Sequence, residues 1–374
     1  MLFIGFSDYV LSEMRRIVID NEHGHLQIAQ QAFWDLAPGN RKNQLLENPD
    51  ALVSLVAQDK DVESVSGRLS FYGLISTGEI TISAKGLGYD PAKEVGFAKS
   101  LTITKGENIQ PNAKLEVLVG YGLQKKLNIA PGATVTVLGY TLDGVVNAVD
   151  LTVKGIFQTS NSEIDNNVFL LPVATAQLLL DTDRVELLTV RLRPEASLLT
   201  ARDRIQTLSA SLMPNVRTKT WYELSNFFRQ VESFYAVQNR IIQIILLSLV
   251  FLGILNTVGM SVFERTGEIG TVRAMGENVP SIVRQFLLEG AVLGLVGALL
   301  GAAAGVIFSL IINACKFMID LPGTSSPIAV AINIVPAGYV EAILIVILAA
   351  VAATWFPSVR ASKMPIVEAL RKNI

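Results

Sequence analysis

Residues Ile241–Val262 read IIQIILLSLVFLGILNTVGMSV, a run of 22 residues without a charged side chain. An α-helix of that length rises about 33 Å, enough to cross the hydrocarbon core of a bilayer. The segments Gly290–Cys315 and Ala342–Val359 are also free of charge, over 26 and 18 residues. Helices buried inside soluble proteins rarely continue this far without a charge. The sequence therefore predicts three membrane-spanning helices in the second half of the chain.

The overall composition agrees with a chain that lies partly in lipid. Only 17% of the 374 residues are charged, whereas soluble domains have about a quarter. The formal net charge of −2 leaves no basic excess to neutralise phosphates, which argues against nucleic acid as a partner. Cys315 is the single cysteine, and His23 and His25 are the only histidines. We therefore expect no internal disulfide and no metal site.

Basic residues predict the orientation of the spans. The linker Phe263–Gln285 carries three arginines and residues 359–374 carry four Lys or Arg, whereas Phe317–Tyr339 carries neither. Positively charged flanks remain cytoplasmic. The linker and the C-terminal tail are therefore expected in the cytoplasm, and residues 21–235 outside it.

Residues 21–235 have the pattern of a folded α+β domain. The apolar residues 1–10 before it are about half a span, so residues 1–20 are expected to form part of a first spanning helix whose beginning is missing. The tripeptide Gly120-Tyr121-Gly122 is interpreted as a turn. Period-two and helical patterns predict strands at Gly24–Ala29, Val65–Leu74, Glu79–Ala84, Thr134–Leu138, Leu151–Phe157 and Leu187–Leu192, and helices at Pro49–Gln58, Val173–Leu180 and Leu198–Leu212.

The linker after the first long apolar run reads FERTGEIGTVRAMG over Phe263–Gly276. Ile269, Val272 and Met275 recur at helical spacing and predict a narrow apolar stripe, and Gly276 is suited to end the helix. A short loop would be enough to join the spans, so the added helix suggests contact with another protein. The alternative is an interfacial helix that only rests on lipid.

This linker, the following Ile282–Gly290 (IVRQFLLEG) and the tail Phe356–Arg371 (FPSVRASKMPIVEALR) closely resemble ABC permeases of the MacB/FtsX superfamily. Leu118–Leu123 and Thr220–Leu224 match as well, so the resemblance covers nearly the whole chain. Within the superfamily the sequence is most similar to the LolC/LolE lipoprotein-releasing subunits. The resemblance implies four transmembrane helices, the first incomplete here, with a large α+β extracytoplasmic domain inserted between the first two.

The resemblance also implies a function. Such a chain is a permease subunit in the bacterial inner membrane, with its large domain in the periplasm. A cytoplasmic dimer of ABC ATPase subunits, holding ATP and Mg, drives extraction of a lipoprotein or other lipidic substrate from the membrane. A second permease subunit, identical or related, and a periplasmic carrier are further implied partners. Alternatives are an FtsX-like mechanotransmitter that controls a periplasmic partner, and an efflux permease.

No G-x-x-x-x-G-K-[ST] motif occurs in the sequence, so we expect neither a cofactor nor a catalytic residue on this chain. Small residues after the linker allow helices to approach closely in lipid, either within the chain or at a dimer seam. The expected packing positions are Gly290, Gly294, Gly297, Gly301 and Gly305. The residues expected to contact the ATPase are Glu264, Arg265, Glu268, Ile269, Val272, Arg273, Met275 and Gly276.

The expected segments follow from these patterns. They are residues 1–20 (first transmembrane helix, partial), 21–235 (periplasmic domain), 236–263 (second transmembrane helix), 264–277 (coupling helix), 278–317 (third transmembrane helix), 318–336 (periplasmic loop), 337–358 (fourth transmembrane helix) and 359–374 (cytoplasmic tail).

Overall fold

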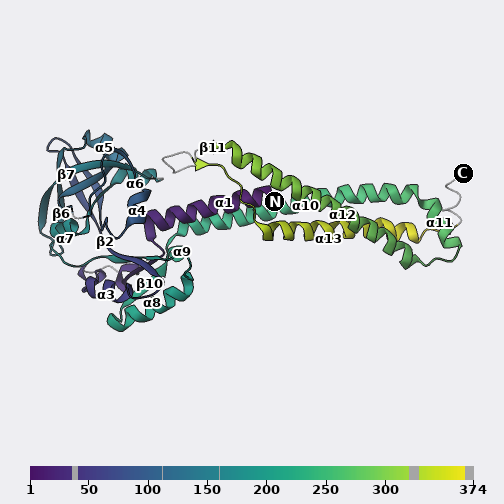
Figure 1. The fold of residues 1–374 in the computed structure, drawn as a ribbon, viewed down its shortest axis with the longest axis horizontal. Helices are drawn as coiled ribbons and strands as arrows, with labels where there is room; N and C mark the ends of the chain where they lie inside the picture. The colour runs from purple at the N-terminus through teal and green to yellow at the C-terminus, as the bar shows by residue number, and fades with distance from the viewer. Residues whose placement is uncertain (36–40, 112, 160, 320–327, 367–374) are drawn as a thin grey trace. The chain divides into compact units, whose positions relative to one another are not determined.

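The structure is a computed structural model that describes residues 1–35, 41–111, 113–159, 161–319 and 328–366 (Figure 1). Parts of the expected periplasmic loop, at 320–327, and of the cytoplasmic tail, from 367 onward, lie outside these ranges. The chain divides into two compact units. The sheet unit comprises Glu13–Arg229 with Ile319–Ile328, and the helical unit comprises Met1–Ser12, Gln230–Met318 and Ala329–Ile374.

One continuous sheet organises the sheet unit. Its strands follow the order β10-β1-β9-β2-β3-β8-β5-β7-β4, and β6 pairs with both β2 and β7. The strands are β1 (Leu26–Gln30), β2 (Val62–Ser76), β3 (Thr81–Tyr89), β4 (Thr102–Gly106), β5 (Glu116–Gly120), β6 (Thr134–Tyr140), β7 (Val146–Gln158), β8 (Val168–Pro172), β9 (Leu187–Leu192) and β10 (Val216–Thr220).

The long strand β2 belongs to two substructures. Its first half, Val62–Arg68, pairs with β9 in a half-sheet that also contains β1 and β10. Its second half, Leu69–Ser76, pairs with β3 and β6. Because β6 also pairs with β7, the ladder β2-β3-β8-β5-β7-β6 closes into a barrel. Alternate side chains of these strands, including Phe71 and Phe169, fill the interior of the barrel.

Short helices cover the sheet unit. They are η1 (Val18–His23), α2 (Gln31–Trp34), η2 (Arg41–Gln44), α3 (Pro49–Val56), α4 (Val95–Ser100), α5 (Tyr121–Leu127), α6 (Ser162–Asn167), α7 (Val173–Leu180), α8 (Leu198–Leu212) and α9 (Trp221–Leu224). Leu52 on α3 and Ile205 on α8 pack with Ile28 and Val190 of the half-sheet to form a second core. The predicted α+β domain is confirmed, but the turn predicted at Gly120–Gly122 is wrong, because β5 ends there and α5 begins.

The helices of the helical unit are α1 (Leu2–Ile17), α10 (Asn226–Glu264), α11 (Thr266–Ala274), α12 (Val279–Cys315) and α13 (Pro336–Ser362). The short strands β11 (Met318–Ile319) and β12 (Ile328–Ala329) lie at the boundaries of this unit along the chain. α1 and α10 each continue into the sheet unit. Within the described ranges, α10, α12 and α13 are the three helices long and apolar enough to cross a membrane. This agrees with the three predicted spans.

The first helix does not join this group. α1 has 16 residues and contains Asp8, whose carboxylate accepts a hydrogen bond of 2.8 Å from the Asn333 amide. Gly5 lies so close to the segment before α13 that a Cβ there would be 2.2 Å from the Asn333 carbonyl oxygen. Residues 2–12 of α1 therefore pack against the segment before α13, within the helical unit. The predicted count of four spanning helices stays a prediction.

Candidate functional site

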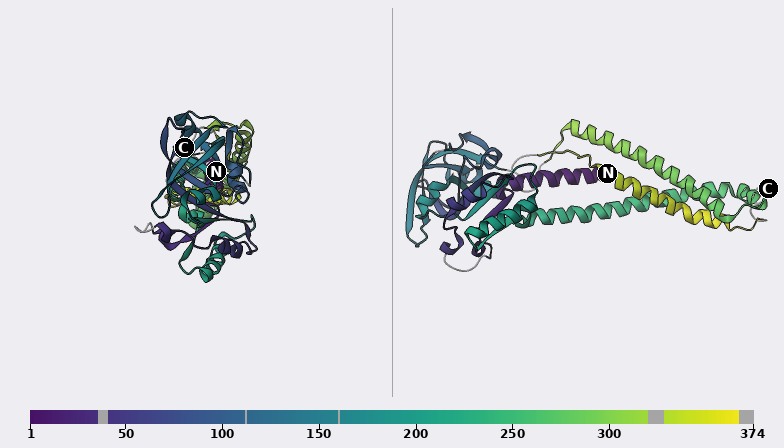
Figure 2. Two further views of the ribbon diagram at one scale, coloured as in Figure 1. Left: turned by 90° about the vertical axis from the view of Figure 1, so that its left-hand side faces the viewer. Right: turned by 60° about the horizontal axis from the view of Figure 1, so that its bottom comes forward.

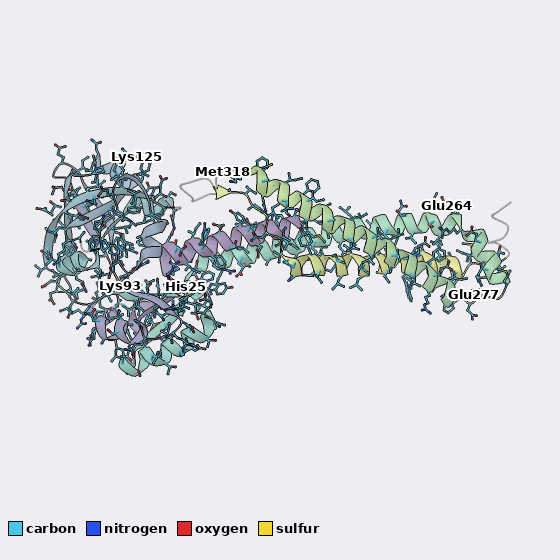
Figure 3. All side chains as sticks on the ribbon, in the orientation of Figure 1. His25, Lys93, Lys125, Glu264, Glu277 and Met318 are labelled. Atoms are coloured by element: carbon cyan, nitrogen blue, oxygen red, sulfur yellow. The ribbon has the colours of Figure 1, made fainter. Side chains whose placement is uncertain are left out.

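The linker helix α11 lies between the long helices α10 and α12, with Glu264 and Glu277 just beyond its two ends (Figure 3). Gly276 has φ +98°, a conformation that side-chain-bearing residues rarely adopt. The N–H groups of Gly276 and Glu277 donate to the carbonyls of Arg273 and Val272, over 3.1 and 3.3 Å. These bonds satisfy carbonyls in the last turn and end the helix at the predicted glycine.

One face of α11 is buried within the chain. Ile269 is only 6% exposed and belongs to a cluster with residues from α10, α12 and α13. The predicted apolar stripe is therefore not exposed at Ile269, because this side chain already packs inside the protein. Val272 and Met275 remain exposed, at 37% and 76%. The partners of Ile269 in the cluster are Val258, Val262, Ile282, Phe286 and Ala361.

The charged residues of the linker also differ in whether they contact the rest of the chain. Arg265 lies 3.5 Å from the Glu289 carboxylate on α12. Arg273 donates a hydrogen bond to the Met364 carbonyl, which ties α11 to the segment after α13. Glu268 is exposed and has no ion pair or hydrogen bond through its side chain among the described residues.

Several residues of the linker are exposed. Glu268 and Val272 are separated by four positions on α11, which places them on one side of that helix, and Met275 follows three residues later on the same side. Glu264 is the last residue of α10, just before α11 begins. Glu264, Glu268 and Met275 are exposed, and Val272 is at least partly so. We call these four residues the outer face of the linker. This face has an acidic edge and an apolar end.

The glycines of α12 divide into two sets. A Cβ at Gly290 would be 2.1 Å from the Thr354 hydroxyl oxygen, and one at Gly294 would be 2.6 Å from the Ala350 Cβ. Both glycines therefore allow α12 and α13 to pack side by side (Figure 2). A Cβ at Gly297 or Gly301 would have no described atom within 4 Å. These two glycines lie on a surface that the described chain does not cover.

The last glycine of the predicted set lies near the other end of α12. A Cβ at Gly305 would be 3.3 Å from the hydroxyl of Tyr339 on α13, which is tight but not a clash. Gly305 thus belongs with the glycines that face α13.

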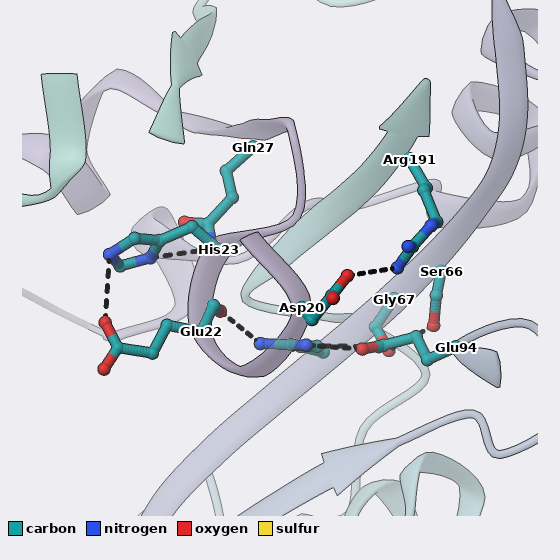
Figure 4. Close-up of polar contacts among 9 residues, drawn as sticks. Asp20, Glu22, His23, Gln27, Ser66, Gly67, Glu94 and Arg191 are labelled. Carbon is teal, nitrogen blue, oxygen red and sulfur yellow. Dashed lines mark hydrogen bonds and ion pairs between the residues drawn. The ribbon is translucent and has the colours of Figure 1, made fainter. Parts of the chain in front are cut away.

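A buried ion pair lies where η1 meets the half-sheet (Figure 4). The Arg68 guanidinium donates from Nε to both carboxylate oxygens of Glu94, over 3.1 and 2.9 Å, and both side chains are 6% exposed. Arg68 also donates to the Glu22 carbonyl. Beside it, Arg191 lies 2.9 Å from Asp20. Sequence reasoning missed this buried ion pair, although a charged residue within the predicted strand Val65–Leu74 was a usable signal.

The two histidines have structural roles at the same junction. Burial, with a smaller effect from the positive charge of Arg68, lowers the pKa of His23 to about 4, so its imidazole is neutral at neutral pH. His25 Nδ1 accepts the Leu192 N–H over 3.2 Å. Gly24 between them has φ +65° and ends η1 before β1 begins. Among the described residues, no group of three or more His, Cys, Asp or Glu side chains could hold a metal.

Comparison with known proteins defines the class. Residues 1–208 match the family model of the MacB-like periplasmic core domain, and residues 240–366 match that of the FtsX-like permease C-terminal region. The first match covers more than half of the chain. The chain therefore belongs to the ABC transporter permeases that carry a MacB-like periplasmic core domain.

Three individual relatives are each less than 30% identical to this chain. The chain is 28% identical to the lipoprotein-releasing system transmembrane protein LolC of Neisseria meningitidis, over 63% of this chain and 58% of LolC. It is 22% identical to LolE of Haemophilus influenzae, over 74% and 67% of the two chains. It is 29% identical to the macrolide export ATP-binding/permease protein MacB of Bdellovibrio bacteriovorus, over 60% of this chain and 35% of MacB. The chain thus spans only part of these relatives.

Proposed function

We propose that this chain is the permease subunit of an ABC transporter that extracts a lipoprotein or another lipidic substrate from the bacterial inner membrane on its periplasmic side. A separate cytoplasmic ATPase dimer, which holds ATP and Mg, would drive the extraction. The relatives LolC and LolE, named as lipoprotein-releasing proteins, support this substrate class. The MacB relative, named as a macrolide exporter, supports an efflux permease as the second candidate.

The observation that carries the proposal is the two-sided linker. Its inner side is anchored to α10, α12 and α13 through Ile269, Arg265 and Arg273. Its outer face leaves Glu268 and Met275 exposed, and among the described residues Glu268 has no ion pair. An ATPase that binds the outer face would pull on three long helices at once. On a helix that only rests on lipid, the exposed apolar and acidic residues would be expected on opposite sides. Here Glu268 and Met275 share one side.

The helix surface around Gly297 and Gly301 supports a second permease subunit as a partner. In lipid, helices associate through close backbone packing at small residues, and a Cβ added at either of these glycines would meet no described side chain or neighbouring helix within 4 Å. An FtsX-like mechanotransmitter would use the same linker and the same helix surface, but its output would be a periplasmic partner. Carrier docking on the sheet unit belongs to the lipoprotein-release proposal alone.

Glu268→Lys tests the coupling. The substitution reverses a charge on the outer face, and losing one partner of an interfacial charged pair costs roughly 2–5 kcal/mol. Helix α11 should persist because Lys and Glu have similar helix propensities. We expect loss of ATPase copurification, or ATP hydrolysis that no longer responds to substrate in the reconstituted complex. Glu79→Lys, an equal charge reversal at an exposed position of the sheet unit, should behave as wild type. Normal copurification and transport with Glu268→Lys would refute the proposal.

The proposed orientation has its own test. In a Cys315→Ala background, a cysteine at Ser162 should react with a membrane-impermeant thiol reagent in intact spheroplasts. A cysteine at Thr271, on the linker helix, should react only after the membrane is permeabilised. Both positions are exposed in the structure, so burial cannot account for a difference. Labelling of Thr271→Cys from outside would overturn the cytoplasmic location of the linker.

A further inference from the structure

The sheet unit contains a cleft of about 560 Å³ on the outside of the barrel. Its floor is the outward surface of β2, β3 and β8, because side chains that alternate with the barrel core point away from it. The register of the three strands aligns these side chains in two rows across the floor. The rows are Tyr72–Lys85–Val168 and Ser70–Leu87–Leu170.

Apolar and aromatic side chains make up about half of the remaining lining of the cleft, beside polar ones such as Asn21, Gln27 and Thr159. Phe33 and Trp34 of α2 line it, with ring centroids 4.8 Å apart in an edge-on arrangement, and Leu224 of α9 contributes a further apolar side chain. The volume lies in the range of about 300–1,000 Å³ that is typical of sites for small ligands. Such walls favour an aliphatic or aromatic group over a polar one.

The charged groups of this cleft are paired unequally, because Arg68 has an ion-pair partner whereas Glu186 and Lys85 have none among the described residues. The Glu186 carboxylate accepts hydrogen bonds from the Ser70 hydroxyl and N–H, over 2.5 and 3.3 Å. Arg68 is neutralised by Glu94, as described above. Lys85 is partly buried and has no hydrogen bond or ion pair from its ammonium group to any described residue.

Glu22 is a further carboxylate of this cleft, and it forms no ion pair with Lys85. Burial is the largest influence on Glu22 and raises its pKa, and its carboxylate lies 3.6 Å from the His23 ring. Lys85 is therefore a cation of the cleft with no carboxylate within ion-pair distance among the described residues. An ammonium group held against apolar side chains is suited to pair with a negatively charged ligand group.

We propose that this cleft binds a single-chain amphiphile with an anionic headgroup. The headgroup pairs with Lys85, and the aliphatic chain lies against Leu87, Val168 and Trp34. This inference rests on the proposed handling of a lipidic substrate for its meaning in the cell. Binding itself needs no ATPase and no coupling helix, so it can be measured, and can fail, independently of that function.

Trp34 provides the readout. The sequence has three tryptophans, and Trp355 on the apolar helix α13 is replaced by Phe to remove quenching from lipid. The whole chain in lipid nanodiscs is titrated with dibromostearate, whose bromine atoms quench indole fluorescence on contact. We expect saturable quenching that unlabelled stearate reverses and that Trp34→Phe abolishes. Quenching that persists in Trp34→Phe would place the amphiphile elsewhere and overturn the proposal.

Lys85→Met then tests the headgroup contact. It removes the charge but keeps an aliphatic side chain of similar length. Losing a charge-assisted hydrogen bond should weaken stearate binding roughly tenfold or more. Dibromostearate methyl ester, which has no charge, should bind Lys85→Met and wild type equally. Lys85→Arg should restore most of the affinity for stearate, and Lys125→Met, which removes a lysine from α5, should have no effect.

The chain contact and the headgroup source need separate arms. Leu87→Asn should weaken the acid and the ester alike, because it reduces the apolar floor. Brominated lysophosphatidylglycerol compares a phosphate headgroup with a carboxylate, and preferential binding of either one would identify the source while supporting the shared chemistry. Unchanged stearate affinity in both Lys85→Met and Leu87→Asn would overturn the proposal, even if Glu268→Lys had already established coupling.

Discussion

Arg68→Leu is expected to lower the free energy of unfolding of the sheet unit by about 3–5 kcal/mol, because removing one partner of a buried ion pair leaves the other charge buried and uncompensated. Arg68 and Glu94 are each only 6% exposed. The guanidinium also lies 4.9 Å from the centre of the Phe97 ring and donates to the Glu22 carbonyl. One substitution therefore removes several interactions between β2, α4 and η1.

Urea denaturation of the purified full chain in detergent, followed by near-ultraviolet circular dichroism, would measure this effect. Lys93→Leu is the matched control, because Lys93 forms a solvent-exposed ion pair with Asp90 and should change stability by less than about 1 kcal/mol. The double variant Arg68→Leu with Glu94→Leu should recover part of the loss, since no unpaired charge remains. Equal midpoints for Arg68→Leu and Lys93→Leu would contradict this interpretation of the junction.

Gly290→Leu is expected to destabilise the packing of α12 on α13 by about 1–3 kcal/mol or more, because the added side chain overfills a close contact. The first added carbon would be 2.1 Å from the Thr354 hydroxyl oxygen, so the two helices must separate. That hydroxyl has little freedom to move, since Thr354 is buried and donates to the Ala350 carbonyl over 2.8 Å.

Gly297→Leu is the matched control, two helical turns further along α12. A Cβ at Gly297 would have no described atom within 4 Å, so its leucine variant should leave the melting temperature of the detergent-solubilised monomer unchanged. Thermal unfolding of both variants under the same conditions gives the comparison. A similar drop in melting temperature for both would show that α12 does not distinguish its two glycine sets in the way the structure indicates.

Local sequence patterns predicted the elements that depend on local interactions. The bounds of α7, α8 and β9 coincide with the predicted ranges, and the three long apolar helices follow from composition alone. The closure of the barrel by β6 could not be predicted, because it depends on pairing with β2, a strand about sixty residues earlier. Long-range pairing leaves no periodic signal in one strand.

The burial and packing of individual side chains was the second feature that the sequence could not predict. Ile269, Val272 and Met275 have the same apolar character and the same spacing, so periodicity could not show that Ile269 packs inward and the others outward. The glycines around Gly120 look like a turn, but a Cβ at Gly120 would be 2.4 Å from the Asp165 carbonyl oxygen. Close packing against α6, which is distant in sequence, explains that glycine, and a single sequence carries no sign of it.

The shared strand β2 imposes an order on the assembly of the newly made domain. Its second half can pair at once with β3, but the other edge of that half must wait for β6, and its first half must wait for β9. β1 waits still longer, since one of its neighbours is β10, the last strand of the sheet. Unpaired edges of this kind are prone to aggregate. The domain therefore cannot complete its sheet until nearly all of its residues have emerged on the side of the membrane where it folds.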